Sequence, residues 1–178
     1  MVKTTLEESR AAAEVRFTAL TNAERHYVAE TPWYWLLYAL GIPSTILSAV
    51  AGATAFAKFP DWVTGTLAIG AAILSGLTTF LEPAKKASAH HAAAKEYEAL
   101  YREADVGLVE TNFEEKRTID ILNRLSSKLN SLSKTSPTIP GMARRVAERR
   151  MAKGTGEVVQ LRPPTPAPNQ PQPSPPVV

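Results

Sequence analysis

The chain contains two apolar segments that decide its fold, WYWLLYALGIPSTILSAVAGATAFA at residues 33–57 and WVTGTLAIGAAILSGLTTFL at residues 62–81. Neither segment contains Asp, Glu, Lys, Arg or His. A helix rises about 1.5 Å per residue and the apolar core of a bilayer is about 30 Å thick, so each segment is long enough to cross it. The sequence therefore predicts an all-α membrane protein built on a transmembrane hairpin, residues 33–81, with spans 33–57 and 62–81.

The charges around the hairpin predict its orientation. Only Lys58-Phe59-Pro60-Asp61 separates the two spans, so both flanks must lie on one side of the membrane. Most nearby Lys and Arg residues are in the flanks, and cytoplasmic loops carry such an excess, so both termini are predicted to be cytoplasmic. Tryptophans prefer the headgroup level, and the three that serve as predicted interface anchors are Trp33, Trp35 and Trp62.

Small and hydroxyl-bearing residues recur at steps of three and four in both spans. In lipid, such residues let helix backbones approach one another, and hydroxyls can also line a water path or bond within the hairpin. The residues predicted to pack helices or to line a pore are Gly41, Ser44, Ser48, Gly52, Gly65, Ala68, Ala72, Ser75, Gly76 and Thr79. Pro43 removes one backbone hydrogen bond, so a kink is expected there, serving either gating or a static bend.

The N-terminal flank, residues 1–32, is predicted to be an amphipathic cytoplasmic helix that ends at Thr31-Pro32, because the residue before a proline avoids the helical region. Packing against the later cytoplasmic helix is favoured over lying on the membrane surface, since the polar face is not strongly cationic. The predicted apolar face consists of Leu6, Ala13, Phe17, Leu20 and Tyr27.

Residues 82–134 are predicted to be a long cytoplasmic helical segment that starts at Pro83, because proline is acceptable in a first helical turn. Within it, four leucines at steps of three and four form a heptad fragment: Leu122, Leu125, Leu129 and Leu132. About two heptads are too few to indicate a coiled coil on their own.

The C-terminal part, residues 135–178, is predicted to be a basic linker followed by a proline-rich disordered tail. Eight of the sixteen residues 163–178 are proline, which favours an extended, unpacked chain. The arginines of residues 142–153 indicate either a solvated, partly helical tether or contact with anionic lipid headgroups.

The composition argues against catalysis and cofactor binding. The chain has no cysteine, and the adjacent His90 and His91 would point about 100° apart on a helix, which does not suit a shared metal. No nucleophile, base and acid can be grouped, and the net charge of +3 lacks a clustered basic face for nucleic acid. We therefore expect no enzyme, no cofactor, no metal and no nucleic-acid partner.

Residues 5–130 resemble the SLATT family, the SMODS- and SLOG-associating two-transmembrane effector domains. The resemblance rests on Trp33 and Trp35 at the entrance to the hairpin, on the short turn, and on five residues after the second span: Pro83, Lys86, His90, Tyr97 and Leu100. It implies the inner (plasma) membrane of a bacterium as the location.

The resemblance also implies a function, that of an antiviral effector in a nucleotide-signal-dependent conflict system, which forms pores or perturbs the membrane. The expected partners are the lipid bilayer, further copies of the chain, and a separate protein that makes or senses the nucleotide. Two alternatives stay open. The chain could be a non-conducting membrane-anchored adapter or scaffold, or a phage-type holin.

Overall fold

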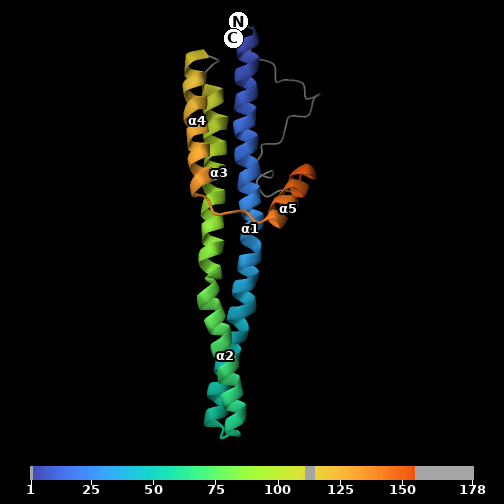
Figure 1. Ribbon diagram of the computed structural model, residues 1–178, viewed down its shortest axis with the longest axis vertical. Coiled ribbons are helices and arrows are strands. Elements are labelled where there is room, and N and C mark those ends of the chain that lie inside the picture. Colours follow the sequence, from blue (N-terminus) through green and yellow to red (C-terminus); the bar gives the residue numbers. More distant parts are fainter. Residues whose placement is uncertain (1, 111–114, 155–178) are drawn as a thin grey trace, which may run out of the picture.

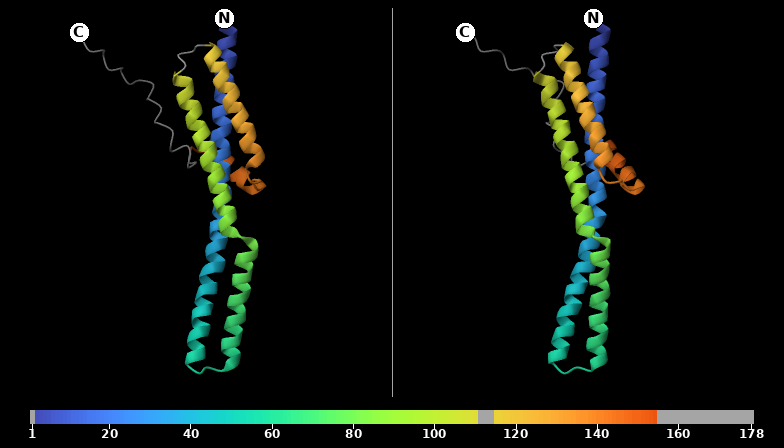
Figure 2. Two further views of the ribbon diagram at one scale, coloured as in Figure 1. Left: turned by 90° about the vertical axis from the view of Figure 1, so that its left-hand side faces the viewer. Right: turned by 60° about the vertical axis from the view of Figure 1, so that its left-hand side comes forward.

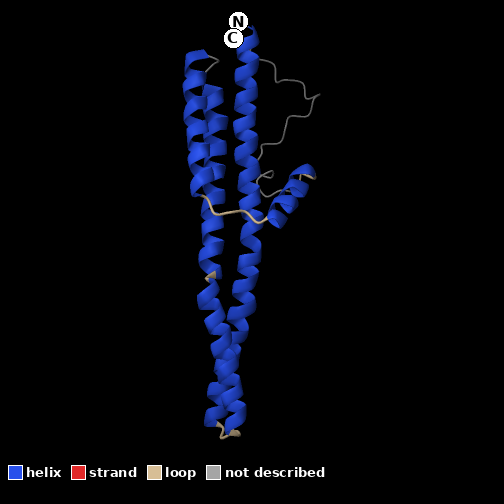
Figure 3. Cartoon of the chain, in the orientation of Figure 1, coloured by secondary structure: helices blue, strands red, loops and turns tan. Residues whose placement is uncertain are grey.

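The computed structural model describes residues 2–110 and 115–154, and within these ranges every regular element is a helix (Figures 1 and 3). The elements are α1 (Val2–Phe56), α2 (Asp61–Leu81), α3 (Pro83–Glu110), α4 (Glu115–Thr135) and α5 (Gly141–Ala152). The predicted all-α class is confirmed. The predicted proline-rich tail, residues 163–178, lies outside the described residues.

Helix α1 runs the length of the molecule (Figure 1) and contains 55 residues, or about 80 Å at 1.5 Å per residue. The predicted end at Thr31-Pro32 is wrong, because Pro32 and Pro43 both lie inside the helix. A proline removes one backbone hydrogen bond but does not forbid helical geometry. Here α3 packs beside α1 before Pro32 and α2 packs beside it afterwards, so tertiary contacts hold the helix on both sides.

The second half of α1 and all of α2 form an antiparallel hairpin (Figure 2). We use "hairpin" below for residues 33–81. Two helical stretches, 10–56 and 61–106, are long and apolar enough to cross a membrane, and only 11% and 6% of their most apolar segments is buried. The turn reverses within four residues, with Lys58 at a φ of 56°.

Helix α3 begins at Pro83, as predicted, and continues upward from α2 along nearly the same line (Figure 2). The two helices are separated by Glu82, whose left-handed backbone has a φ of 45° and whose N–H donates to the carbonyl of Thr78 at 3.2 Å. The chain therefore descends through α1 and returns through α2 and α3, so the hairpin is joined directly to the remaining helices.

The first half of α1 packs with α3 and α4 into a bundle, and α5 lies against another side of α1 (Figure 1). We use "bundle" below for residues 2–32, 83–110 and 115–154. The heptad leucines of α4 serve this intrachain packing: Leu125 is fully buried, and Leu129 and Leu132 pack on the same core clusters.

The expected contact between the N-terminal helix and the later cytoplasmic helix is present, but the expected face is partly wrong. Phe17 is 65% exposed and Ala13 is exposed, while Ala19 and Ala23 are fully buried. Alanine lets α1 approach α3 closely, which places the larger Phe17 on the outside. By hydrophobicity alone, Phe17 would be expected in the core in preference to an alanine. Close packing of α1 against α3 instead places alanines in the core and leaves Phe17 exposed.

Helix α5 replaces the tether that was expected after residue 141. Its Ala143 and Ala147 are buried against Val28 and Ala29 of α1. Two ion pairs reinforce the contact, Arg25 to Glu148 at 2.9 Å and Glu24 to Arg150 at 3.7 Å. The basic segment is therefore held against α1 by the alanine face of α5.

Candidate functional site

Two hydroxyl pairs hold the inside of the hairpin together. Ser44 is 7% exposed; its Oγ donates to the carbonyl of Ala71 at 3.2 Å and lies 2.8 Å from the Oγ of Ser75. Nearer the turn, the hydroxyl of Thr64 donates to Thr54 at 3.0 Å. Among the predicted packing or pore residues, Ser44 and Ser75 are thus brought together within one hairpin.

The remaining members of the predicted set point away from this inner contact. Gly41 is half-buried, and the others are exposed: Ser48, Gly52, Gly65, Ala68, Ala72, Gly76 and Thr79. A Cβ built on Gly41, Gly52, Gly65 or Gly76 meets nothing within 4 Å, whereas one on Gly70 meets Leu47 at 3.5 Å. The outer faces therefore have room for another helix, and their role in packing or in lining a pore stays a prediction.

Large apolar side chains cover the rest of the outer surface of the hairpin. Ile42, Ile69 and Ile73 are each more than half exposed, and so are the predicted anchors Trp35 and Trp62. The third anchor, Trp33, is half-buried, with the Lys86 ammonium 4.6 Å from its ring centroid. This cation–π contact joins the start of the hairpin in α1 to the first turn of α3.

Directly beyond the hairpin, α1 and α3 enclose a polar cluster. The Nδ1 atoms of His26 and His90 lie 3.1 Å apart, and the ring of Tyr97 stacks on His26 at a centroid distance of 5.6 Å. All three side chains are buried. Of the family-like residues, Pro83, His90, Tyr97 and Leu100 lie on the buried face of α3, and Lys86 lies at its exposed edge.

Burial sets the charge state of the two histidines. Burial and, to a smaller extent, the positive charge that His90 can carry together lower the pKa of His26 to about 4. Burial also lowers the pKa of His90, opposed by the Glu30 carboxylate. Both imidazoles are therefore neutral at pH 7, and one Nδ1–H donates to the other Nδ1.

A second buried group, Glu98, lies on α3 eight residues beyond His90. It accepts hydrogen bonds from the Tyr27 hydroxyl at 2.9 Å and from Lys95 at 3.1 Å, and it pairs with Arg102. Burial acts to raise the pKa of Glu98, but these hydrogen bonds and charges outweigh it and lower the pKa. Burial raises the pKa of Tyr27. Glu98 is thus an ionised carboxylate inside the α1–α3 contact.

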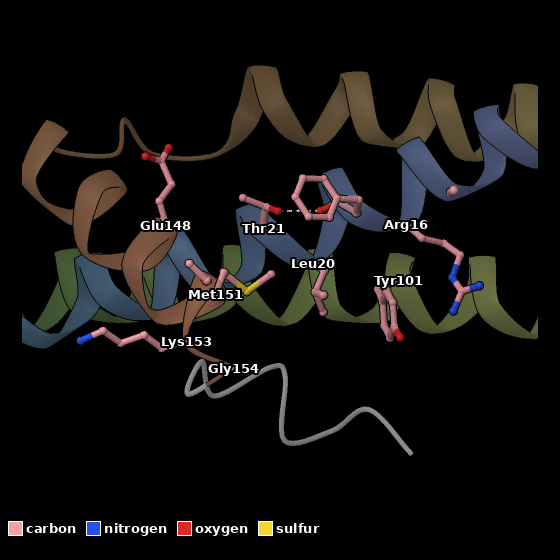
Figure 4. Close-up of a pocket in the computed structure, with 11 residues that line it drawn as sticks. Arg16, Leu20, Thr21, Tyr101, Glu148, Met151, Lys153 and Gly154 are labelled. Carbon is pink, nitrogen blue, oxygen red and sulfur yellow. Dashed lines mark hydrogen bonds between the residues drawn. The ribbon is translucent and has the colours of Figure 1, made fainter. Parts of the chain in front are cut away.

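A groove of about 910 Å³ lies farther along the bundle, between α1, α3 and the C-terminal end of α5, and its lining residues are drawn in Figure 4. Its apolar lining includes Phe17, Leu20 and Met151, and Tyr101 contributes from α3. The guanidinium of Arg16 lies 5.7 Å from the Tyr101 ring centroid and pairs with Asp105. The groove exists because α5 docks, which is why the sequence did not reveal it.

The pairing of His26 with His90 was also missed from the sequence. The two residues are 64 positions apart, and attention to the adjacent His90 and His91 hid the partner on α1. The available signal was the seven-residue spacing of His90 and Tyr97, which places both on one face of a predicted helix. Among the described residues, no group of three or more His, Cys, Asp or Glu side chains is placed to hold a metal ion.

Comparisons with protein-family models, with curated proteins and with solved structures found no match to this chain. The likeness to the SLATT family therefore rests on the residues quoted above and on the order of the helices.

Proposed function

We propose that this chain is a membrane effector whose hairpins associate and open or perturb a bilayer, while the bundle holds the resting state. One observation carries the proposal, the outer surface of the hairpin. That surface combines large apolar side chains with exposed alanine and serine positions and with glycines that have open space beside them. Lipid can cover the large apolar side chains, and a neighbouring helix can pack against the small residues.

Insertion into a membrane is supported by the low burial of the apolar helices. The core helix of a water-soluble protein is mostly buried, whereas only 11% and 6% of these two apolar segments is covered within the chain. Exposed apolar surface of this extent marks an interaction site. By the proposal, lipid and further copies of the hairpin cover it, in the plasma membrane of a bacterium, with both termini cytoplasmic.

Association of several copies is part of the proposal, because two spans cannot enclose a water path. The hydroxyls divide into two groups in this respect. Thr45, Thr66 and Thr79 donate to the carbonyl four residues earlier, whereas Ser48 lies on the outer surface. Ser48 is therefore the hydroxyl that we assign to a contact between copies or to a water path.

Reconstitution of the full chain in liposomes tests the proposal through release of a trapped dye. The variant Ser48→Leu adds bulk to the outer surface of the hairpin and should abolish release. Its matched control, Ile46→Leu, changes a neighbouring outward side chain without adding bulk, and release should be retained. Vesicles that stay intact at all protein densities and activating conditions, or equal release by both variants, would contradict a pore.

The adapter alternative is favoured by a different observation, the groove of Figure 4. A groove with exposed Phe17 and half-buried Met151 suits a partner protein, and methionine adapts readily to varied surfaces. In an adapter, Phe17→Ser would abolish recruitment of a partner while Ser48→Leu would have no effect. In the proposed effector the same pair of variants gives the reverse result for dye release.

A further inference from the structure

We infer that His26 and His90 form a proton-binding site that controls the contact between α1 and α3 at the mouth of the hairpin. When both are neutral they hold the two helices together, and protonation of the pair opens the contact. This inference deepens the proposed function, because it supplies a stimulus to the same hairpin. We call the contact around these two residues the "joint".

The position of the joint makes it suitable for control. His26 lies seven residues before Trp33, which is about 10 Å along α1 at 1.5 Å per residue. His90 lies on α3, which begins two residues after the end of α2 and continues its direction (Figure 2). Each span of the hairpin is therefore connected to the joint by a helix, α1 for the first span and α3 for the second. Separation of α1 from α3 at the joint changes the relative positions of the two spans.

The geometry of the two rings makes the contact sensitive to protons. In the neutral pair, one Nδ1–H donates to the bare Nδ1 of the other ring across 3.1 Å. If both rings gain a proton, each Nδ1 carries a hydrogen, so no acceptor remains between them. Two positive charges then face each other at hydrogen-bond distance in a buried site, where water screens them poorly.

The surroundings of the pair leave little room for water while the joint is closed. Ala29 on α1 and Ala87 and Ala94 on α3 are fully buried at this level. Tyr97 covers one face of the His26 ring, with an angle of 17° between the two planes. Hydration of two imidazolium rings therefore requires the helices to move apart.

Charged and titratable groups from α1, α3 and α5 surround the joint. Glu30 acts to keep a proton on His90, but it also lies 3.0 Å from the exposed His91. On α4, the described residues that pack against this region are the apolar Leu129 and Leu132. The titratable and charged groups around the joint are Glu24, Arg25, Tyr27 and Glu30 on α1, Lys86, His91, Lys95, Tyr97 and Glu98 on α3, and Glu148 and Arg150 on α5.

Two of these neighbours, Glu98 and Tyr27, do not supply an alternative switch in the same pH range. Glu98 keeps its charge, since its pKa is lowered. Tyr27 stays protonated, because its pKa is raised. An opening that begins when the pH falls below about 6.5, the ordinary pKa of histidine, is assigned to the buried pair. The exposed His91 is separated from the pair by the variant His91→Gln.

The absence of cysteine from the sequence permits a direct distance measurement on the full chain. Thr31→Cys on α1 and Ala92→Cys on α3 place two spin labels at exposed positions beside the joint. Electron–electron double resonance in lipid nanodiscs should give one short distance at pH 7.5. As the pH is lowered from 6.5 towards 4.5, a second and longer distance should appear and become the major population.

Glutamine variants separate the pair from general effects of acid. In His26→Gln/His90→Gln, the amides still donate and accept but do not titrate, so the short distance should persist to pH 4.5. The matched control His91→Gln removes the exposed third histidine and should open as the unsubstituted chain does. If the double variant fails to fold, His90→Gln alone must weaken the response or shift its midpoint.

Constant distances down to pH 4.5 in the unsubstituted chain would overturn the inference, and so would equal opening of the glutamine double variant. Dye release from liposomes at the same pH values separates this inference from the proposed function. Opening without release supports the joint and contradicts the pore. Release at acid pH without any change in distance supports the pore and contradicts the joint.

Discussion

The two halves of α1 belong to the same continuous helix but lie in different surroundings. In the bundle, α1 buries Ala19, Ala23 and His26 almost completely against α3 and α4. In the hairpin, α1 lies beside α2, and the described α1 residues that are buried there are Ser44 and Ala51. The bundle therefore completes its own packing, whereas the hairpin leaves most of its apolar surface to be covered by its environment.

Polar contacts differ between the regions in the same way. The bundle carries charged side chains in pairs, and it encloses the His26–His90 contact and the ionised Glu98. The hairpin uses short, uncharged bonds such as Ser44 to Ser75, or hydroxyls bonded to their own helix. A charge inside a bilayer is unfavourable unless it is paired, so this difference is what a membrane would require of the hairpin.

The largest effect is expected from removing a core side chain of the bundle. Leu125→Ala deletes a fully buried leucine between α4 and the rest of the bundle and should destabilise it by about 3 kcal/mol. Leu77→Ala, at a position 43% exposed in the hairpin, should leave bundle unfolding nearly unchanged. Guanidinium unfolding in mild detergent, followed by circular dichroism, measures both; equal losses would remove the contrast between the regions.

A charge on the outer surface of the hairpin should have an effect of similar size, on membrane insertion rather than on the stability of the bundle. Ile73→Lys places an ammonium on an outward position of α2, and near the centre of a bilayer this should disfavour insertion by about 3 kcal/mol. Ile119→Lys, on the exposed surface of α4, should have no such effect. The fraction of protein that resists carbonate extraction from membranes is the measure. Full retention of Ile73→Lys would argue against a buried span.

The response to acid should occur in two ranges within the bundle. For the histidines, the folded pKa is lowered, so their contribution to stability is present above pH 6.5 and is lost as the pH falls towards about 4, the pKa of His26. For Glu98, the pKa is also lowered, but a carboxylate stabilises in its charged form, so its contribution is lost only below about pH 4.5.

Glu98→Gln should therefore remove the lower range and leave the upper one, with a loss of about 1 to 3 kcal/mol at pH 7 from the broken charged hydrogen bonds. Thermal unfolding midpoints between pH 8 and 3 measure this. A variant that instead loses the response between pH 6.5 and 4.5 would show that Glu98, rather than the histidine pair, governs that range.

The smallest effect is expected inside the hairpin. Ser44→Ala removes the hydroxyl that bonds to Ser75 and to the carbonyl of Ala71, and hydrogen bonds between helices in membranes contribute only about 0.6 kcal/mol on average. Thr45→Ala, whose hydroxyl bonds its own helix at Gly41, is the control and should have no measurable effect. Forced separation of labelled spans in bicelles resolves differences of this size. A loss of several kcal/mol would mean that Ser44 has further partners.

Much of the fold could be predicted because its signals are local. The two apolar segments, the turn at Lys58 to Asp61 and the start of a helix at Pro83 each follow from composition or from a single residue. Local rules failed at Pro32, where α1 continues as a helix, packed against its neighbours, through a residue that usually ends a helix. They failed again at Phe17, because close packing of alanines rotated the larger side chain outward.

The sequence by itself determined that the chain is helical and that the two uncharged spans of its hairpin are suited to lipid, because residue spacing and hydropathy are properties of each segment alone. Only the tertiary structure decided that His26 faces His90, that Ser44 faces Ser75, and that α5 docks on α1. Those pairings depend on the rotation and axial offset of one helix relative to another. No local spacing encodes these two quantities, and the packing of the whole chain sets them.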